Sequence, residues 1–121
     1  MSNINIHAGD FRKGKYGNFR SGKFHLTSND GGLFGYKGKT YTPDMVEVLD
    51  VASEESVKRI GGTVGWGVAG AVILGPVGLL AGLLLGGKGK NVNFVAKFSD
   101  GRKMLATTDS KTFTAMQAAV F

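Results

Sequence analysis

The chain contains no cysteine and only two prolines among its 121 residues. Without thiols it can form no disulfide framework, carries no thiolate nucleophile and offers no cysteine-based zinc site. The first residues also lack the apolar core of a secretion signal, so we expect no cleaved export sequence. The lack of cysteine fits a reducing compartment. The length predicts one domain with one modest hydrophobic core.

Groups suited to catalysis are scarce as well. The two histidines, His7 and His25, lie without a nearby nucleophile motif. Because a catalytic imidazole needs an orienting partner, we interpret His7 as an exposed terminal residue and His25 as a strand-surface residue. Asp44, Glu47 and Asp50 recur every three residues, but the valines between them favour a strand with a solvated edge over a metal site. The sequence therefore predicts a protein that is not an enzyme and holds no metal or cofactor.

A phosphate-binding glycine loop is not supported either. Residues 65–70 match the pattern GxGxxG. No convincing strand precedes this match, and no acidic residue lies about 20 positions beyond it, as a dinucleotide site would require. The pattern GxxxxGK[ST] does not occur. Helix packing explains the glycine spacing better.

The most informative feature that is present is an apolar segment, residues 61–87, whose 27 positions carry no charge in a chain of net charge +6. About 20 apolar residues suffice to cross a bilayer as a helix. Small residues recur at four-residue steps, so one helical face would let another backbone approach closely. We expect that face to hold a homo-oligomer together. Its members are Gly67, Ala71, Gly75, Gly78, Gly82 and Gly86.

Three arrangements of this segment stay open: a single membrane span, a membrane-inserted hairpin, and a hairpin buried in a soluble oligomer. Pro76 removes a helical hydrogen bond and clashes with the preceding turn, which favours a break at Gly75-Pro76. A single span would also place the strands before and after the segment on opposite sides of a membrane. We therefore favour a helical hairpin that returns the chain to the same side.

Basic residues gather near the start of the chain and on both flanks of the apolar segment. Each would contribute about 1 kcal/mol of attraction near an anionic lipid surface. Trp66 fits an anchor at the membrane interface. We expect a membrane-associated protein whose soluble part is cytoplasmic and whose partner is anionic lipid. The expected anionic-surface contacts are Arg12, Lys13, Lys15, Arg20, Lys23, Lys58, Arg59, Lys88 and Lys90.

Residues 8–23 mix glycine, basic residues and aromatics without a helical or strand period. We interpret this stretch as a mobile arm or irregular edge, and we separate residues 1–22, a basic aromatic arm, from a single domain over 23–121. Nucleic acid is a second partner for the arm. Its cations could neutralise phosphates while four aromatic side chains stack on bases. These are Phe11, Tyr16, Phe19 and Phe24.

Alternating and capping patterns predict the remaining elements. We expect a strand over 23–27, short strands within 33–41, a turn at 42–44 and a strand over 45–51. Ser53 can cap a short helix that ends near residue 60.

The most secure expectation is a hairpin of 92–98 with 102–108. A three-residue loop with Gly101 in a left-handed conformation pairs Ala96 with Met104 and Phe94 with Ala106. Asp109 can then cap a final helix over 110–121. The apolar stripe of that helix consists of Phe113, Met116 and Val120, and it can cover the sheet.

The fold class expected from these elements is α+β: a small antiparallel sheet with a C-terminal helix and an inserted Gly-rich apolar helical hairpin at 61–87. The hairpin at Asp100-Gly101-Arg102, the final helix from Ser110 and the stretch 32–51 together resemble small bacterial and phage domains of the pleckstrin-homology-like type. The resemblance covers roughly 23–121 and implies no catalytic residues. The apolar insertion departs from that family's ordinary fold.

Two functions follow from the sequence. The first is a non-enzymatic membrane-associated module that oligomerises through a glycine-zipper hairpin and scaffolds or perturbs a bacterial membrane. The alternative is a soluble oligomeric binding protein whose basic arm holds nucleic acid or a small anionic ligand.

Overall fold

The computed structural model describes residues 3–28, 37–61 and 91–121. Within these ranges the chain forms one antiparallel sheet of seven strands in the order β4-β3-β2-β1-β7-β6-β5, together with two α-helices and a short 3-10 helix, η2. The strands are β1 (Asn3–Gly9), β2 (Gly14–Arg20), β3 (Lys23–Ser28), β4 (Lys37–Tyr41), β5 (Val46–Val51), β6 (Asn91–Phe98) and β7 (Lys103–Asp109). The helices are α1 (Glu54–Ile60), α5 (Ser110–Val120) and η2 (Pro43–Met45).

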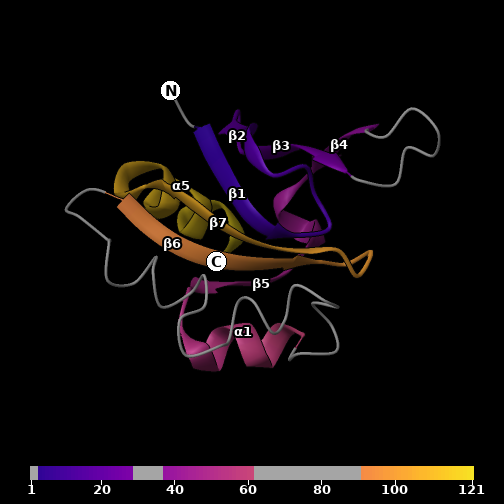
Figure 1. The fold of residues 1–121 in the computed structure, drawn as a ribbon. Coiled ribbons are helices and arrows are strands. Elements are labelled where there is room, and N and C mark those ends of the chain that lie inside the picture. Colours follow the sequence, from indigo (N-terminus) through magenta and orange to yellow (C-terminus); the bar gives the residue numbers. More distant parts are fainter. Residues whose placement is uncertain (1–2, 29–36, 62–90) are drawn as a thin grey trace.

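The sheet curves into a half-barrel, with α5 against its inner face and α1 against the outer face of the β5–β6 end (Figure 1). β1 lies in the middle of the sheet because it pairs with β2 on one side and with β7 on the other. The strands before residue 61 and those after residue 91 therefore belong to the same sheet, as the sequence predicted.

Aromatic side chains dominate the core on the inner face. Phe98 stacks on Tyr41 with ring centroids 4.0 Å apart, and Phe11 meets both rings edge-on. Phe24 reaches the same cluster, at 5.6 Å from Phe98. Edge-to-face and offset stacks of this kind are favourable beyond the area they bury. They join β3, β4 and β6 across the inside of the half-barrel.

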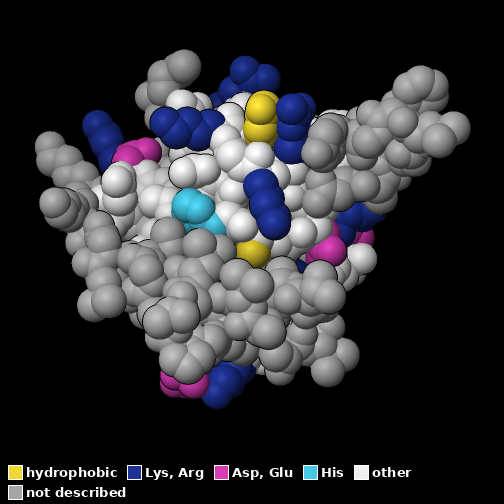
Figure 2. Space-filling model, viewed as in Figure 1, with side chains coloured by type: hydrophobic (Ala, Val, Ile, Leu, Met, Phe, Trp, Pro, Cys, Tyr) yellow, Lys and Arg dark blue, Asp and Glu magenta, His cyan; other side chains and the backbone are white. Residues whose placement is uncertain are grey.

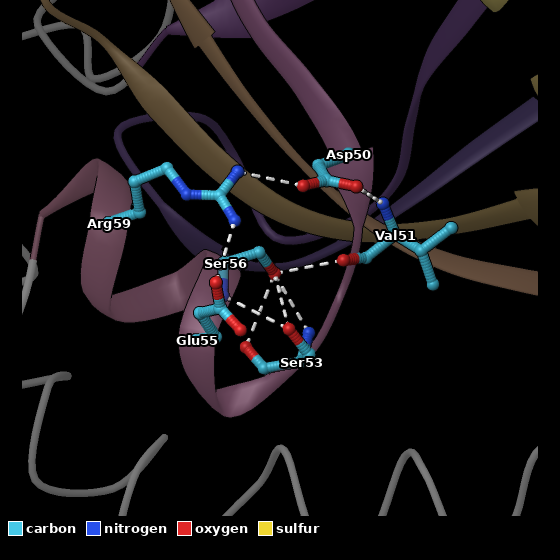
Figure 3. A network of polar contacts seen from close by, with 6 residues as sticks. All are labelled: Asp50, Val51, Ser53, Glu55, Ser56 and Arg59. Atoms are coloured by element: carbon cyan, nitrogen blue, oxygen red, sulfur yellow. Dashed lines mark hydrogen bonds and ion pairs between the residues drawn. The ribbon is translucent and has the colours of Figure 1, made fainter.

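A smaller core lies on the outer face, under α1. Val57 and Ile60 of α1 pack with Val95 of β6 and Leu105 of β7. Ser53 caps the helix as predicted, since its side chain accepts a hydrogen bond from the Ser56 backbone N–H while Ser56 bonds back to the Ser53 N–H. Figure 3 shows this capping network and the ion pairs of the neighbouring Arg59. The cap fixes the short helix against the end of β5.

The expected α+β fold class is wrong. The described chain is mainly sheet, with seven strands and only two short α-helices, and no helical hairpin occurs in the described ranges. The sheet is larger than expected because residues 3–20 supply two further strands, β1 and β2. The expected hairpin at 61–87 falls, apart from Gly61, outside the described residues. In the described ranges no helix has the length and apolar character needed to cross a membrane.

The expectation of a mobile arm or irregular edge over 8–23 is also wrong. Phe11 is fully buried, and Phe19 of β2 is 5% exposed. The pairing of β1 with β2 shifts register between Ile4 and Ile6, and glycines interrupt β2. These irregularities hide the two-residue period in the sequence, whereas the pairing with β7 and β3 satisfies the backbone.

The β6–β7 hairpin is confirmed in detail. Ala96 pairs with Met104 and Phe94 with Ala106, and Gly101 has a φ of +91°, in the left-handed region. The strand 23–27 is confirmed as β3, the 45–51 strand as β5 from residue 46, and the turn at 42–44 as η2. Of the 33–41 stretch, the described part forms β4.

The final helix is confirmed as well. Asp109 caps α5 by accepting a hydrogen bond from the Thr112 backbone N–H at 3.0 Å. Phe113 and Met116 are buried in the inner core, and Val120 packs against it partly buried. The helix therefore covers the sheet through the predicted stripe.

Candidate functional site

The outer face carries a row of uncharged polar side chains across four neighbouring strands. Asn5 lies between Ile4 and Ile6 of the inner core, so its side chain is on the opposite, outer face, and the strand register identifies its neighbours there. Register places Asn93 opposite Thr107, Thr107 opposite Asn5, and Asn3 opposite Asn18. We call this set the polar row: Asn3, Asn5, His7, Asn18, Asn93 and Thr107.

His7 lies at an irregularity of β1. The pairing of β1 with β7 shifts register between Ile6 and Ala8, so His7 is an extra residue in its strand. Such bulges often re-aim a side chain next to a functional site. Here the imidazole Nε2 lies 2.7 Å from the Thr107 hydroxyl.

The hydrogen-bond geometry fixes the tautomer of His7. The Thr107 hydroxyl donates to Oδ1 of Asn93 at 2.5 Å, so its only hydrogen is used. The imidazole must then donate from Nε2 to the Thr107 oxygen. The other ring nitrogen, Nδ1, is left as an acceptor, and no described residue donates to it.

The expectation that His7 is an exposed terminal residue is wrong, because the side chain is half-buried within a strand. Burial lowers the pKa of His7 below its ordinary value by disfavouring the charged form. The imidazole is therefore neutral at pH 7. His25, in contrast, lies on the strand surface as predicted, 3.4 Å from the Thr40 hydroxyl.

Asn18 has the second unsatisfied acceptor on this face. Its side-chain oxygen Oδ1 is buried and has no hydrogen-bond partner among the described residues. Buried polar atoms are nearly always paired, and each exception calls for an explanation. Two acceptors without donors, on the adjacent strands β1 and β2, thus lie on the same face of the sheet.

Strands β2 to β4 and the turn before β2 are strongly basic, and we call this region the cationic wing. Between Asp10 and Asp44 the described residues include no Asp or Glu. Figure 2 shows the outer face. Most of the Lys and Arg side chains visible there lie above a histidine, in the part of the view where Figure 1 places β1 to β4. Among the described residues the following wing cations form no ion pair: Lys13, Lys15, Arg20, Lys23, Lys37 and Lys39.

Cations on the other half of the sheet are neutralised locally. Lys58 pairs with Glu54 at 2.8 Å, and Arg59 pairs with Asp50 at 2.9 Å and with Glu55 at 3.4 Å. Exposed pairs of this kind add little stability, but they leave no local excess of charge. Among the described strands, the cations that form no ion pair therefore lie on the cationic wing.

The aromatic residues of 11–24 have a different role from the predicted one. Phe11, Phe19 and Phe24 are buried in the inner core, so the prediction that they stack on bases is wrong. Tyr16 alone of the four is exposed, at 49%, and the Arg12 guanidinium lies 3.8 Å from the centre of its ring. One amphipathic ring therefore remains on the surface of the wing.

Tyr41, Asp100 and Arg102 form a hydrogen-bonded cluster, which we call the polar clasp. The Tyr41 hydroxyl donates to the Asp100 carboxylate at 2.6 Å, and the Arg102 guanidinium donates to the same oxygen at 2.6 Å. Burial, followed by the hydrogen bond to Asp100, raises the pKa of Tyr41 well above its ordinary value. The clasp joins β4 to the β6–β7 turn, which is a structural role.

Of the predicted contacts with an anionic surface, Arg12, Lys13, Lys15, Arg20 and Lys23 come together on the cationic wing, whereas Lys58 and Arg59 lie on α1. Lys88, Lys90, Trp66 and the six small residues Gly67, Ala71, Gly75, Gly78, Gly82 and Gly86 fall outside the described residues, as does the 65–70 glycine pattern. Within the described ranges, no three His, Asp or Glu side chains converge as a metal site requires.

Sequence reasoning missed the polar row. The available signal was the frequency of asparagine at alternate positions, as in Asn3-Ile4-Asn5-Ile6 and Asn91-Val92-Asn93-Phe94. That alternation marks a strand with one polar face, but it does not reveal which strands are neighbours. Comparisons of the chain with models of protein families, with curated proteins and with solved structures find no match.

Proposed function

We propose that the protein is a non-enzymatic membrane-associated module whose folded sheet lies at the membrane surface and whose segment 61–87 enters the bilayer. The observation that carries the proposal is the uncharged 27-residue run itself. It connects α1 to β6, and β6 pairs with β5, the strand that precedes α1. Both ends of the segment are thus attached to the same folded unit.

This attachment supports a segment that enters and leaves on the same side of the membrane. β5 pairs with β6 and β1 pairs with β7, so the parts before and after the segment cannot be separated by a bilayer without breaking the sheet. The proposal includes oligomers that assemble through the small residues of the segment, where close backbone approach gains dispersion contacts. The partner is anionic lipid, and the folded part lies in the cytoplasm.

Flotation with vesicles of anionic lipid tests the proposal. The wild-type chain is expected to float with the vesicles, and Leu80→Lys with Leu84→Lys is expected to abolish flotation, because each lysine costs about 2.5–3.5 kcal/mol at the centre of a membrane helix. Gln117→Lys with Ala118→Lys adds the same charge at exposed positions of α5 and controls for it. Wild-type protein that stays wholly unbound without detergent would refute the proposal.

The resemblance to small pleckstrin-homology-like domains stays a proposal. It is supported by the β6–β7 hairpin followed at once by α5, since that pattern is one of the features on which the resemblance rests.

A second function, binding of a soluble polyanion, is favoured by the unpaired charges of the cationic wing. Arg20→Gln with Lys23→Gln removes two wing charges, and Lys58→Gln with Arg59→Gln removes two that are paired with acids. If the wing binds nucleic acid, the first variant weakens binding of a labelled DNA duplex and reduces its salt dependence by about two counterions, whereas the second has little effect. Equal losses in both variants would show that only net charge matters.

A further inference from the structure

The asparagines of the polar row occupy positions in β-strands, where asparagine is uncommon. Asn is depleted in strands because its short polar side chain packs poorly on a pleated surface. Yet Asn3, Asn5, Asn18 and Asn93 occupy strand positions, and none of them belongs to either hydrophobic core. Departures of this kind are expected mainly where a function requires them.

The chemistry of the row matches hydroxyl groups. Nδ1 of His7 and Oδ1 of Asn18 are acceptors to which no described residue donates, and an amide offers donors beside its acceptor. A hydroxyl group both donates and accepts, so a ligand with several hydroxyls could satisfy acceptors and donors together. The row spans four strands, or about 14 Å at the usual strand spacing. This extent favours a chain of sugar units over a single one.

Charge and an aromatic ring lie beside the row. Arg20 stands directly opposite Lys23, next to Asn18 and His25 and on their face of the sheet. Like charges directly opposite each other destabilise a strand pair, and a bound anion relieves that repulsion. Tyr16, two residues before Asn18 on the same strand, offers an exposed ring against which a sugar can pack.

We propose that the outer face of β1, β2, β6 and β7 binds an acidic carbohydrate chain, whose hydroxyls contact the polar row and whose acidic groups lie at Arg20 and Lys23. A simple anion would use the cations but leave the uncharged row unexplained. Single-stranded nucleic acid is bound largely by aromatic stacking platforms, and three of the four aromatics of this region are in the core. This inference is independent of membrane binding.

Titration calorimetry with three probes tests the inference: an alginate oligosaccharide, a dextran oligosaccharide of equal length, and inorganic polyphosphate. The wild-type chain is expected to bind alginate at least tenfold more tightly than dextran. Asn18→Leu, which is nearly isosteric and removes the unpaired acceptor, is expected to weaken alginate binding at least tenfold and to leave polyphosphate binding unchanged. Asn5→Ala, on the neighbouring strand β1, should act in the same direction.

Two further variants separate the row from the charges. Arg20→Gln with Lys23→Gln is expected to weaken binding of both alginate and polyphosphate. Gln117→Leu exchanges an amide for leucine on exposed α5 and is expected to change neither. Alginate binding that is missing in the wild type, or that survives in both Asn18→Leu and Asn5→Ala, overturns the inference. Dextran binding equal to that of alginate overturns the acidic part of it.

Discussion

At His7 one irregularity of the backbone determines both the hydrogen bonds and the charge of a side chain. The extra residue in β1 turns the imidazole toward Thr107, and the Thr107–Asn93 hydrogen bond then requires Nε2 to be the protonated nitrogen. A second proton on the ring would have to be held in a half-buried position, where the charged form is disfavoured. The surroundings of His7 therefore favour the neutral imidazole.

The protonation of His7 predicts how stability depends on pH. Because the pKa of His7 is lower in the folded state than the ordinary value of 6.5, the unfolded chain binds the proton first as the pH falls. The free energy of unfolding should therefore decrease from pH 6.5 downward, by at most about 1.4 kcal/mol per pH unit for one proton. Above about pH 6.5 His7 is neutral in both the folded and the unfolded chain, so its titration no longer changes the free energy of unfolding.

Urea denaturation at several pH values measures this effect. His7→Gln retains an amide that can donate to Thr107 but does not titrate, so it should remove this part of the pH dependence. His25→Gln, which removes the other imidazole, is expected to retain it. A pH profile of His7→Gln that parallels the wild-type profile would contradict the assignment.

At the scale of elements, the N-terminal cap of α5 shows how one side chain stabilises the start of a helix. Asp109 caps α5, and the hydrogen bond from the Thr112 hydroxyl is the main cause that lowers the pKa of Asp109. Asp109→Ala should cost about 1 kcal/mol of unfolding free energy at pH 7. The ionised form of Asp109 is favoured in the folded state. Its ionisation therefore adds fully to the free energy of unfolding above the unfolded pKa of about 3.9, and this stabilisation is lost as the pH falls below that value.

Thermal or urea unfolding of the wild type and Asp109→Ala at pH 7 and pH 3 checks this prediction, with Asp44→Ala, on η2, as a control for loss of a carboxylate. The difference between wild type and Asp109→Ala should shrink at pH 3. A difference of the same size at both values would show that ionisation of Asp109 does not contribute.

Elements were predictable from sequence where short-range chemistry defines them. Ser53, Gly101 and Asp109 each mark a cap or a turn, and α1, the β6–β7 hairpin and α5 were found through them. β1 and β2 were not, because their support is long-range. Gly9, for example, ends β1 at a φ of +120° and lies so close to β7 that an added Cβ would be 2.2 Å from the Lys103 carbonyl oxygen. In sequence this residue is typical of a loop.

The candidate site could not be predicted for the same reason. The wing cations from Arg12 to Lys23 were identified from the sequence, but Lys37 and Lys39 were not. Whether each cation has an acidic partner depends on which strands are neighbours. Likewise, Asn93 and Asn5 become members of one row only when β7 lies between β6 and β1. Strand order is a property of the whole chain, and local patterns do not carry it.

At the scale of the whole molecule, the sheet joins residues from both sides of the apolar segment. If the segment enters a membrane, tags at residues 1 and 121 should therefore be on the same side. Protease treatment of sealed vesicles measures this. Cleavage of only one terminal tag would establish a single span and contradict the proposed arrangement.

The pairing of β1 with β7 has a consequence for the order of folding. Of the described strands, β1 is synthesised first and β7 last, and Ile6 lies opposite Ala106, 100 positions further along the chain. Until β7 has been synthesised, β1 can pair only with β2, so strands β1 to β4 can form a partial sheet in which β1 still lacks its second neighbour. Contacts of such long sequence separation slow folding, because the entropy of loop closure must be overcome before they form. The half-barrel can therefore be completed only after the apolar segment has been synthesised, because β6 and β7 follow it in the chain.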